Sequence, residues 1–276
     1  MAPEKDYFTY DDKAPVQGAE SQPVIVGEGA IGGVSSDGKR QVRTIMGDAF
    51  TPKTVDGKVQ VAAFDFDGTS MDGNSPVLLV LYLAKKNMLT KIDTLRIGLW
   101  ALRYKFRLPQ DEAWVRGMVF RAFEGRPVDE VDQFLYDFHD EVIAPRFRAA
   151  ADAAMERHHL AGEVVLVVSA TFEPIVRRAM EFHPIDGQMS TRMVVEDGKY
   201  TRRVLGAPVE GSEKLNAINA WCDAHYGAGN WELAYAYGDH HSDRPMLQVA
   251  KHAFAVNPDR PLSRTAKSGN WTVLEW

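Results

Sequence analysis

Two carboxylates, Asp65 and Asp67, end an apolar stretch of the chain and are spaced so that they could act together. The stretch at 61–64 is typical of a buried β-strand, and Gly68-Thr69 follows it as a turn. Alternation along a strand would place the side chains of Asp65 and Asp67 on the same side. Two carboxylates at the end of a buried strand are unfavourable unless a cation or a reaction uses them. The pair therefore predicts a functional site.

Other polar groups follow other predicted strands or open the helix before one. In an open α/β sheet, ligands bind beyond the carboxyl ends of the strands, so we expect these groups to meet at one edge. They are Ser169 with Ala170 and Thr171 after a strand at 163–169, Lys214 at the start of a helix at 213–225, and Asp239 and Asp243 after a strand at 233–237.

This set of groups suits the hydrolysis of a phosphate ester. Asp65 and Asp239 offer the hard oxygen ligands that Mg²⁺ prefers. The hydroxyl of Ser169 and nearby amides could hold phosphate oxygens, and Lys214 could neutralise charge in the transition state. An ionised aspartate can attack phosphorus to form an aspartyl-phosphate, while a second carboxyl exchanges protons with the leaving alcohol and with water. Each group alone could be structural, but their common order after buried strands favours a Mg²⁺-dependent site.

The elements that must position these groups alternate between strand and helix. Continuous apolar strands are expected at 59–65, 163–169, 233–237 and 252–256, with helices at 213–225 and 244–250 among them. Strands that are apolar on both faces are typical of a parallel sheet between two helix layers. The sequence therefore predicts an α/β fold with a doubly wound parallel sheet.

The segment between the first two strands shows only helical patterns. It predicts an all-helical cap at 76–158, with Asn74 or Ser75 as the N-cap of its first helix. The catalytic core would then comprise 59–75 and 159–276. A β-hairpin is expected from arms at 189–195 and 200–204. Residues 1–58, rich in Gly, Asp, Pro and Ser, predict an extension that is partly disordered and leave a homodimer open.

The overall composition narrows the class of protein. The 276 residues carry a net charge of −6, which argues against a nucleic-acid partner. Cys222 is the only cysteine, so no intrachain disulfide can form and a reducing cytoplasm fits. The first residues lack the basic-then-apolar order of a signal peptide, and the apolar run at 77–84 is too short to span a bilayer. We therefore expect a cytoplasmic protein without stable membrane insertion.

The motifs resemble those of the haloacid dehalogenase superfamily of hydrolases. Asp65-Phe66-Asp67-Gly68-Thr69 is similar to its first motif, Ser169 to the second, Lys214 to the third, and Gly238-Asp239 with Asp243 to the fourth. A helical insertion directly after the first motif resembles the cap of the phosphoserine-phosphatase-like branch. The resemblance implies a Rossmann-like core that uses Mg²⁺.

The resemblance also implies a role for each carboxylate. Asp65 would be the nucleophile and a metal ligand, and Asp67 the acid and base, whose backbone carbonyl also reaches Mg²⁺. Asp239 would bind the metal directly, and Asp243 through water or through another ligand. His240 and His241 lie beside Asp239 but are not assigned to this metal, because Mg²⁺ prefers oxygen.

Departures from the family pattern bear on the substrate. Asn74 stands where phosphoserine phosphatases carry a glutamate for the substrate's amino group, and Ser70 replaces the usual leucine after the first motif. Asn74 is therefore a candidate substrate-binding residue. Phosphoserine becomes one candidate beside histidinol phosphate and other amino-alcohol phosphates.

The charge of the predicted cap adds further alternatives. Residues 85–121 carry nine Lys or Arg and three Asp or Glu, a net charge of +6. Arg103 in this stretch could reach an anionic substrate. The basic, aromatic stretch also leaves open a lipid-phosphate phosphatase. A non-catalytic phosphometabolite-binding protein is a third reading, although such a protein would normally lack the nucleophile or the lysine.

Overall fold

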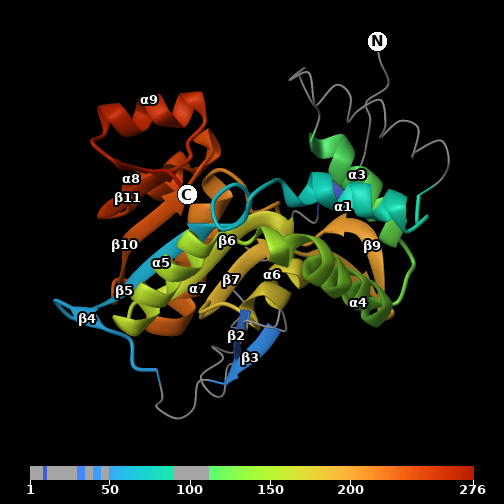
Figure 1. The fold of residues 1–276 in the computed structure, drawn as a ribbon, viewed down its shortest axis with the longest axis horizontal. Coiled ribbons are helices and arrows are strands. Elements are labelled where there is room, and N and C mark those ends of the chain that lie inside the picture. Colours follow the sequence, from blue (N-terminus) through green and yellow to red (C-terminus); the bar gives the residue numbers. More distant parts are fainter. Residues whose placement is uncertain (1–8, 11–29, 35–39, 45–49, 90–111) are drawn as a thin grey trace.

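A sheet of parallel strands forms the centre of the molecule in the computed structural model, which describes residues 9–10, 30–34, 40–44, 50–89 and 112–276 (Figure 1). From one edge to the other, the strands run in the order β7 (Gly187–Thr191), β6 (Val164–Phe172), β5 (Lys58–Asp65), β10 (Trp231–Gly238), β11 (His252–Val256) and β12 (Thr272–Leu274). The short strand β4 (Thr54–Val55) pairs antiparallel with the start of β5.

The strand order is that of a doubly wound fold. Numbered along the chain, the six parallel strands lie in the order 3-2-1-4-5-6. Successive strands are added toward one edge from β5 and toward the other edge from β10, so the strand order reverses between these two strands. A crevice forms at such a reversal, outside the carboxyl ends of the two strands. The fold therefore predicts the binding site at the ends of β5 and β10.

Helices cover both faces of the sheet. The helices α5 (Ala149–Leu160) and α6 (Glu173–Met180) pack on one face together with Ala62 and Phe64 of β5. The opposite face, with Val61 and Ala63, is covered by α7 (Ser212–Tyr226), α8 (Arg244–Val249) and α9 (Arg260–Ser268). Because successive residues of a strand point to opposite faces, a continuous apolar run supplies both cores. The predicted doubly wound sheet is confirmed.

The inserted segment forms a group of helices beside the sheet. Its described helices are α1 (Ser75–Lys85), α3 (Glu112–Phe123), α4 (Val128–Phe138), a π-helix (His139–Ile143) and a 3₁₀-helix (Ala144–Arg146). Figure 1 shows the hairpin of β8 (Met193–Glu196) and β9 (Lys199–Val204) next to α3 and α4. The backbone N–H groups of Gly125 and Val128 donate to the carbonyls of Tyr200 and Gly198, at 2.8 and 3.0 Å. Strands from a later part of the chain therefore complete the helical group.

Three details differ from the sequence-based expectation. The single strand predicted at 189–195 is wrong, because β7 pairs with β6 in the central sheet and β8 begins only after Arg192. The helix α9 was not predicted, although Asp259 caps it by accepting from the backbone N–H of Leu262 at 2.7 Å. The helix α5 lies on the sheet, although the predicted cap included it. The division of the chain into extension, core and cap stays a prediction.

Part of the predicted N-terminal extension has regular structure. The strands β2 (Ala30–Val34) and β3 (Arg40–Thr44) form an antiparallel hairpin, and β1 (Thr9–Tyr10) pairs parallel with β9. Nearer the core, Phe50 stacks on His159 with ring centroids 4.8 Å apart. The Lys53 ammonium lies 2.8 Å from the Glu163 carboxylate. The segment just before β5 therefore docks on the core.

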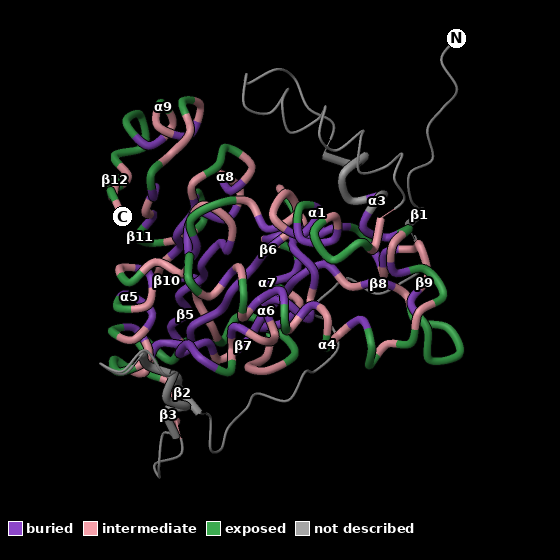
Figure 2. The backbone as a smooth tube through the Cα atoms, turned by 45° about the vertical axis from the view of Figure 1, so that its right-hand side comes forward, coloured by how far each residue is buried: buried purple, intermediate pink, exposed green. Residues whose placement is uncertain are grey.

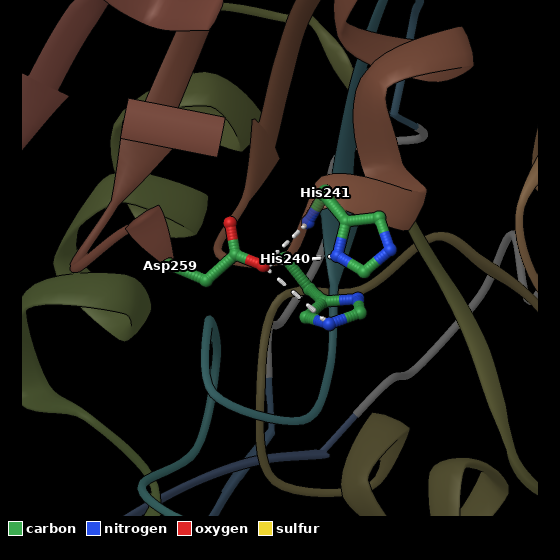
Figure 3. A group of neighbouring side chains, drawn as sticks. All are labelled: His240, His241 and Asp259. Carbon is green, nitrogen blue, oxygen red and sulfur yellow. Dashed lines mark hydrogen bonds and ion pairs between the residues drawn. The ribbon is translucent and has the colours of Figure 1, made fainter. Parts of the chain in front are cut away.

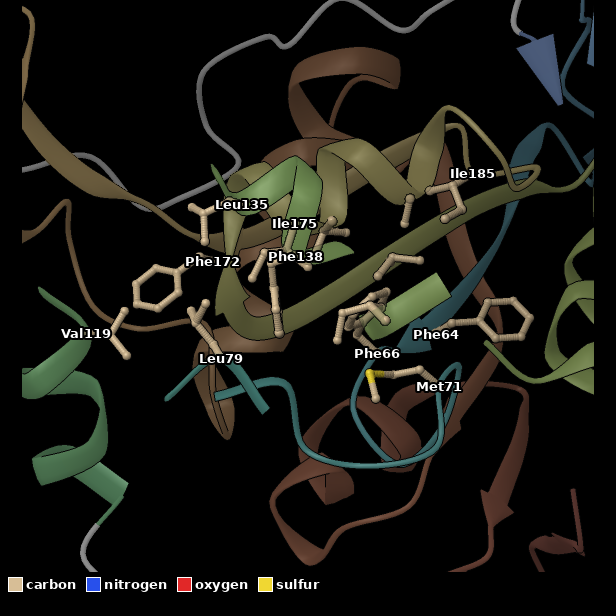
Figure 4. Packing of buried hydrophobic residues seen from close by; sticks show 14 of the residues in the cluster. Phe64, Phe66, Met71, Leu79, Val119, Leu135, Phe138, Phe172, Ile175 and Ile185 are labelled. Atoms are coloured by element: carbon tan, nitrogen blue, oxygen red, sulfur yellow. The ribbon is translucent and has the colours of Figure 1, made fainter. Parts of the chain in front are cut away.

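Aromatic and aliphatic side chains pack tightly around the end of β5 (Figure 4). Phe66 and Met71, on either side of the turn after the strand, are fully buried. Burying a side chain of this size contributes about 1.5–3 kcal/mol. Figure 2 shows that the middle of the central sheet is buried, and the inner strands β5 and β6 carry mostly buried residues. This packing holds the turn that carries Asp67 in one conformation.

Candidate active site

Asp65 and Lys214 form the centre of the site. Asp65 is the last residue of β5, and Lys214 lies in the first turn of α7. The Lys214 ammonium lies 2.5 Å from Asp65 Oδ1 and 2.6 Å from Asp243 Oδ1, and all three side chains are buried. Burial lowers the pKa of Lys214, but the charges of Asp243 and Asp65 raise it by more. The lysine therefore stays a cation next to the Asp65 carboxylate.

Three carboxylates gather at the reversal of the strand order. Oxygens of Asp65, Asp239 and Asp243 all lie within 4.8 Å of one another. Thr69 Oγ1 lies between two of them, 3.4 Å from Asp65 Oδ2 and 3.4 Å from Asp239 Oδ1. Burial, and then the charges of Asp65 and Asp243, raise the pKa of Asp239 to about 9. Mutual repulsion of this kind is relieved when a cation binds.

The site fits a small oxygen-liganded cation such as Mg²⁺. Gly68 has a positive φ of 76°, and a Cβ at this position would lie 2.1 Å from Asp239 Oδ2. The absence of a side chain thus lets the Asp239 carboxylate approach the turn. Asp243 accepts from Lys214 and from the backbone N–H of His240, at 3.1 Å. Its carboxylate therefore orients the lysine, and Asp65, Asp239 and Asp243 together form the group that could hold a metal ion.

Asp67 has different partners from Asp65. The strand β5 ends at Asp65, and the Asp67 carboxylate accepts from Ser75 instead, at 2.7 Å from the backbone N–H and 2.8 Å from the hydroxyl. Strand alternation therefore does not extend to Asp67, and the expectation that Asp65 and Asp67 share a side stays a prediction. Burial and the charge of Asp65 raise the pKa of Asp67 to about 7, although the Ser75 hydrogen bonds oppose this. A carboxyl with this pKa can both give and take a proton near neutral pH.

The residues of the second motif lie next to Ser75. The strand β6 continues through Ser169, Ala170 and Thr171, beyond the end expected at 169, and α6 begins at Glu173. The Thr171 backbone N–H donates to Ser169 Oγ at 3.1 Å, and the hydroxyls of Thr171 and Ser75 share a short hydrogen bond. Three hydroxyls thus connect the second motif to Asp67.

A family model places the chain among known hydrolases. That model, described as haloacid dehalogenase-like hydrolase, matches residues 62–248. The matched range includes all four motifs. The chain belongs to the haloacid dehalogenase-like hydrolase family. The resemblance drawn from the motifs is confirmed, and with it the expectation of a hydrolase.

Relatives and a solved structure cover most of the chain. A histidinol-phosphatase of Neisseria meningitidis is 27% identical over 78% of this chain and 98% of its own length. Phosphoserine phosphatase SerB1 of Mycobacterium tuberculosis is 28% identical over 78% of this chain and 70% of its own length. A solved structure of a protein with unknown function from Bordetella pertussis shares the fold with a TM-score of 0.68 at 24% identity, covering 79% of this chain and 98% of that one. The two relatives confirm the phosphoserine-phosphatase-like branch, and the solved structure confirms the fold.

Asn74 and Arg103 are the two predicted substrate-binding residues outside the four motifs, and only Asn74 lies among the described residues. Asn74 caps α1, since its side-chain oxygen accepts from the backbone N–H of Val77 at 3.1 Å. This contact explains an asparagine at the position without a substrate, and its role in substrate binding stays a prediction. Arg103 lies outside the described residues.

Two serines were not recognised as functional from the sequence. Ser75 was expected only as a possible helix cap, yet it holds Asp67 by two hydrogen bonds. Ser70 replaces the usual leucine, and its hydroxyl donates to the backbone carbonyl of Asp65 at 2.5 Å. Their positions beside the first motif were the only signal in the sequence.

In the described part of the chain, no helix is long and apolar enough to cross a bilayer.

Proposed function

We propose that the protein is a Mg²⁺-dependent phosphomonoesterase that acts through an aspartyl-phosphate on Asp65. The observation that carries the proposal is the position of the Asp65 carboxylate, 2.5 Å from the Lys214 ammonium at the reversal of the strand order. The names of the histidinol-phosphatase and phosphoserine phosphatase relatives support this chemistry. A non-catalytic role is disfavoured because both the nucleophile and the lysine are present and paired.

The proposed reaction has two steps. In the first, an Asp65 oxygen attacks phosphorus, the bond to the alcohol oxygen breaks, and Asp67 gives its proton to the leaving alcohol. In the second, Asp67 takes a proton from water, the water oxygen attacks phosphorus, and phosphate leaves Asp65. Lys214 offsets negative charge on the phosphoryl oxygens throughout. Mg²⁺, when held by Asp65, Asp239 and the Asp67 carbonyl, would neutralise further charge on the phosphoryl group.

The helices beside the site supply a surface for the leaving group. We place α1, α3 and α4 in the proposed cap, together with the β8–β9 hairpin that packs on them. A cap that closes over the leaving group would set the choice of substrate. A small amino-alcohol phosphate is the proposed class, and Asn74 is the proposed contact to it. A cytoplasmic location and a homodimer stay predictions.

Hydrolysis of an aryl phosphate tests the chemistry. The wild-type protein should hydrolyse the compound with Mg²⁺ and lose the activity with excess chelator. Asp65→Asn should lower kcat by about 10³-fold or more, since it removes the attacking oxygen. Asp129→Asn, an exposed aspartate on α4, is the matched control and should keep wild-type activity. Undiminished turnover by Asp65→Asn would contradict the proposal.

The same assay with a panel of phosphates tests the substrate class. We expect the highest kcat/KM for an amino-alcohol phosphate such as histidinol phosphate or phosphoserine. Sugar and nucleotide phosphates should react more slowly. A clear preference for a lipid phosphate would instead favour the alternative drawn from the basic stretch at 85–121.

A further inference from the structure

A second cluster of side chains that could hold a metal ion lies outside the proposed phosphatase machinery. His240 and His241 directly follow Asp239, and Asp259 precedes α9 (Figure 3). Asp259 Oδ2 lies 3.0 Å from His241 Nδ1 and 3.5 Å from His240 Nε2. The two imidazoles are 50% and 46% exposed, so an ion can reach them from solvent.

The backbone holds the carboxylate of this cluster in place. Asp259 Oδ1 accepts from the Leu262 N–H at 2.7 Å as the cap of α9, and Oδ2 accepts from the His241 N–H at 3.3 Å. The backbone N–H of Asp259 donates to the Asp239 carbonyl at 2.8 Å, which ties the start of α9 to the loop with the histidines. The cluster is therefore built on two connected segments and does not depend on freely rotating side chains alone.

The spacing of the ligand atoms matches a tetrahedral zinc site. Zinc binds histidine nitrogen at about 2.0–2.1 Å, so two ligand atoms at a tetrahedral ion lie about 3.3–3.4 Å apart. The two contacts to Asp259, at 3.0 and 3.5 Å, are on either side of this value. All three ligand atoms lie within 4.8 Å of one another, and exposed imidazoles can rotate to close the remaining gap.

The hydrogen bonds of the histidines are compatible with a metal. His240 Nδ1 lies 2.9 Å from Ser242 Oγ and 3.4 Å from the Ser242 backbone nitrogen, so the Nε2 lone pair is open to an ion in the tautomer whose Nδ1–H donates to the Ser242 hydroxyl. His241 Nδ1 can bind the ion in the tautomer that carries the ring proton on Nε2. Imidazole nitrogens suit Zn²⁺, whereas Mg²⁺ prefers oxygen.

We propose that His240, His241 and Asp259 bind one Zn²⁺ ion, at a site separate from the carboxylates of Asp65 and Asp239. Three protein ligands leave a fourth position open to water or to another small ligand. The site does not depend on the proposed phosphatase activity, and its test measures binding of the metal alone.

The experiment uses the full chain without a histidine tag, in saturating Mg²⁺. Zn²⁺ is titrated against a chromophoric chelator, and we expect one bound ion per chain. His240→Ala and His241→Ala should each weaken binding at least about tenfold. Asp259→Asn should do the same, while its remaining side-chain oxygen can still cap α9.

A matched control separates this site from other exposed histidines. His252 on β11 is also exposed, and His252→Ala should bind Zn²⁺ as the wild type does. Wild-type affinity in both His240→Ala and His241→Ala would overturn the proposal, because the ion would then bind elsewhere, such as the carboxylates of the active site. An equal loss in His252→Ala would overturn it too. Unchanged thermal melting of the apo variants shows that they are folded.

Discussion

The affinity of the active site for Mg²⁺ should depend steeply on pH. Burial and the charges of Asp65 and Asp243 raise the pKa of Asp239 to about 9 in the metal-free protein. At pH 7 we therefore expect this carboxyl to be mostly protonated. A carboxylate must lose its proton to bind the ion, so Mg²⁺ and the proton compete for Asp239. The affinity for Mg²⁺ should rise as the pH rises, because a larger fraction of the protein then carries Asp239 as an ionised carboxylate.

The size of the effect follows from that pKa. With a pKa of about 9, Asp239 is about 1% ionised at pH 7 and about 50% ionised at pH 9. The apparent affinity should therefore increase about 50-fold over this range, and about tenfold between pH 7 and pH 8. A carboxyl with an ordinary pKa of about 3.9 is fully ionised throughout and would give no change.

Isothermal titration calorimetry measures both the affinity and the protons released. Titrations at pH 7, 8 and 9, at one ionic strength and in buffers of different ionisation enthalpy, should show about one proton released per Mg²⁺ at pH 7. Asp239→Asn removes the titrating group and should bind Mg²⁺ weakly, with little change between pH 7 and pH 9. An affinity that stays within twofold across this range in the wild type, without proton release, would refute the reasoning.

Two further substitutions test the turn after β5 and the partner of Asp67. Gly68→Ala should weaken Mg²⁺ binding at least about tenfold, because its Cβ would lie 2.1 Å from Asp239 Oδ2. Gly57→Ala is the matched control, since Gly57 has a similar φ of 78° but open space around it; calorimetry should find wild-type affinity there, and a loss in both variants would point to backbone strain alone. Ser75→Ala removes a hydroxyl that lowers the pKa of Asp67, so the alkaline limb of the kcat profile should move up by about one pH unit. If the alkaline limb of the Ser75→Ala profile stays at the wild-type pH, that limb does not report the ionisation of Asp67.

Much of the core could be predicted from local patterns. The strand predicted at 59–65 corresponds to β5, and Asn74, one of the two predicted caps, is the N-cap of α1. Burial on both faces leaves a continuous apolar run in the sequence, and a helix cap needs only a hydrogen bond to the next turn. The helix α9 was missed because it is short and rich in charged residues, although Asp259 and Pro261 are typical of a helix start.

The hairpin shows why the expected strand at 189–195 failed. Its residues continue in extended conformation through the end of β7 and into β8, so the local pattern looks like one strand. The change of sheet at Arg192 depends on which neighbours each half pairs with, β6 for one and β9 for the other. Those neighbours come together only in the folded chain.

The sequence by itself determined the chemistry that the site can offer. Carboxylates, a lysine and hydroxyls placed after buried strands must meet at one edge of a parallel sheet, because the strands all end there. Only the tertiary structure decided how they pair. Lys214 and Asp65 are 149 positions apart along the chain, and Ser75 and Thr171 are 96 apart. Packing of helices on the sheet brings such groups within 3 Å of each other. The distance between two residues along the sequence does not indicate whether this packing will bring them together.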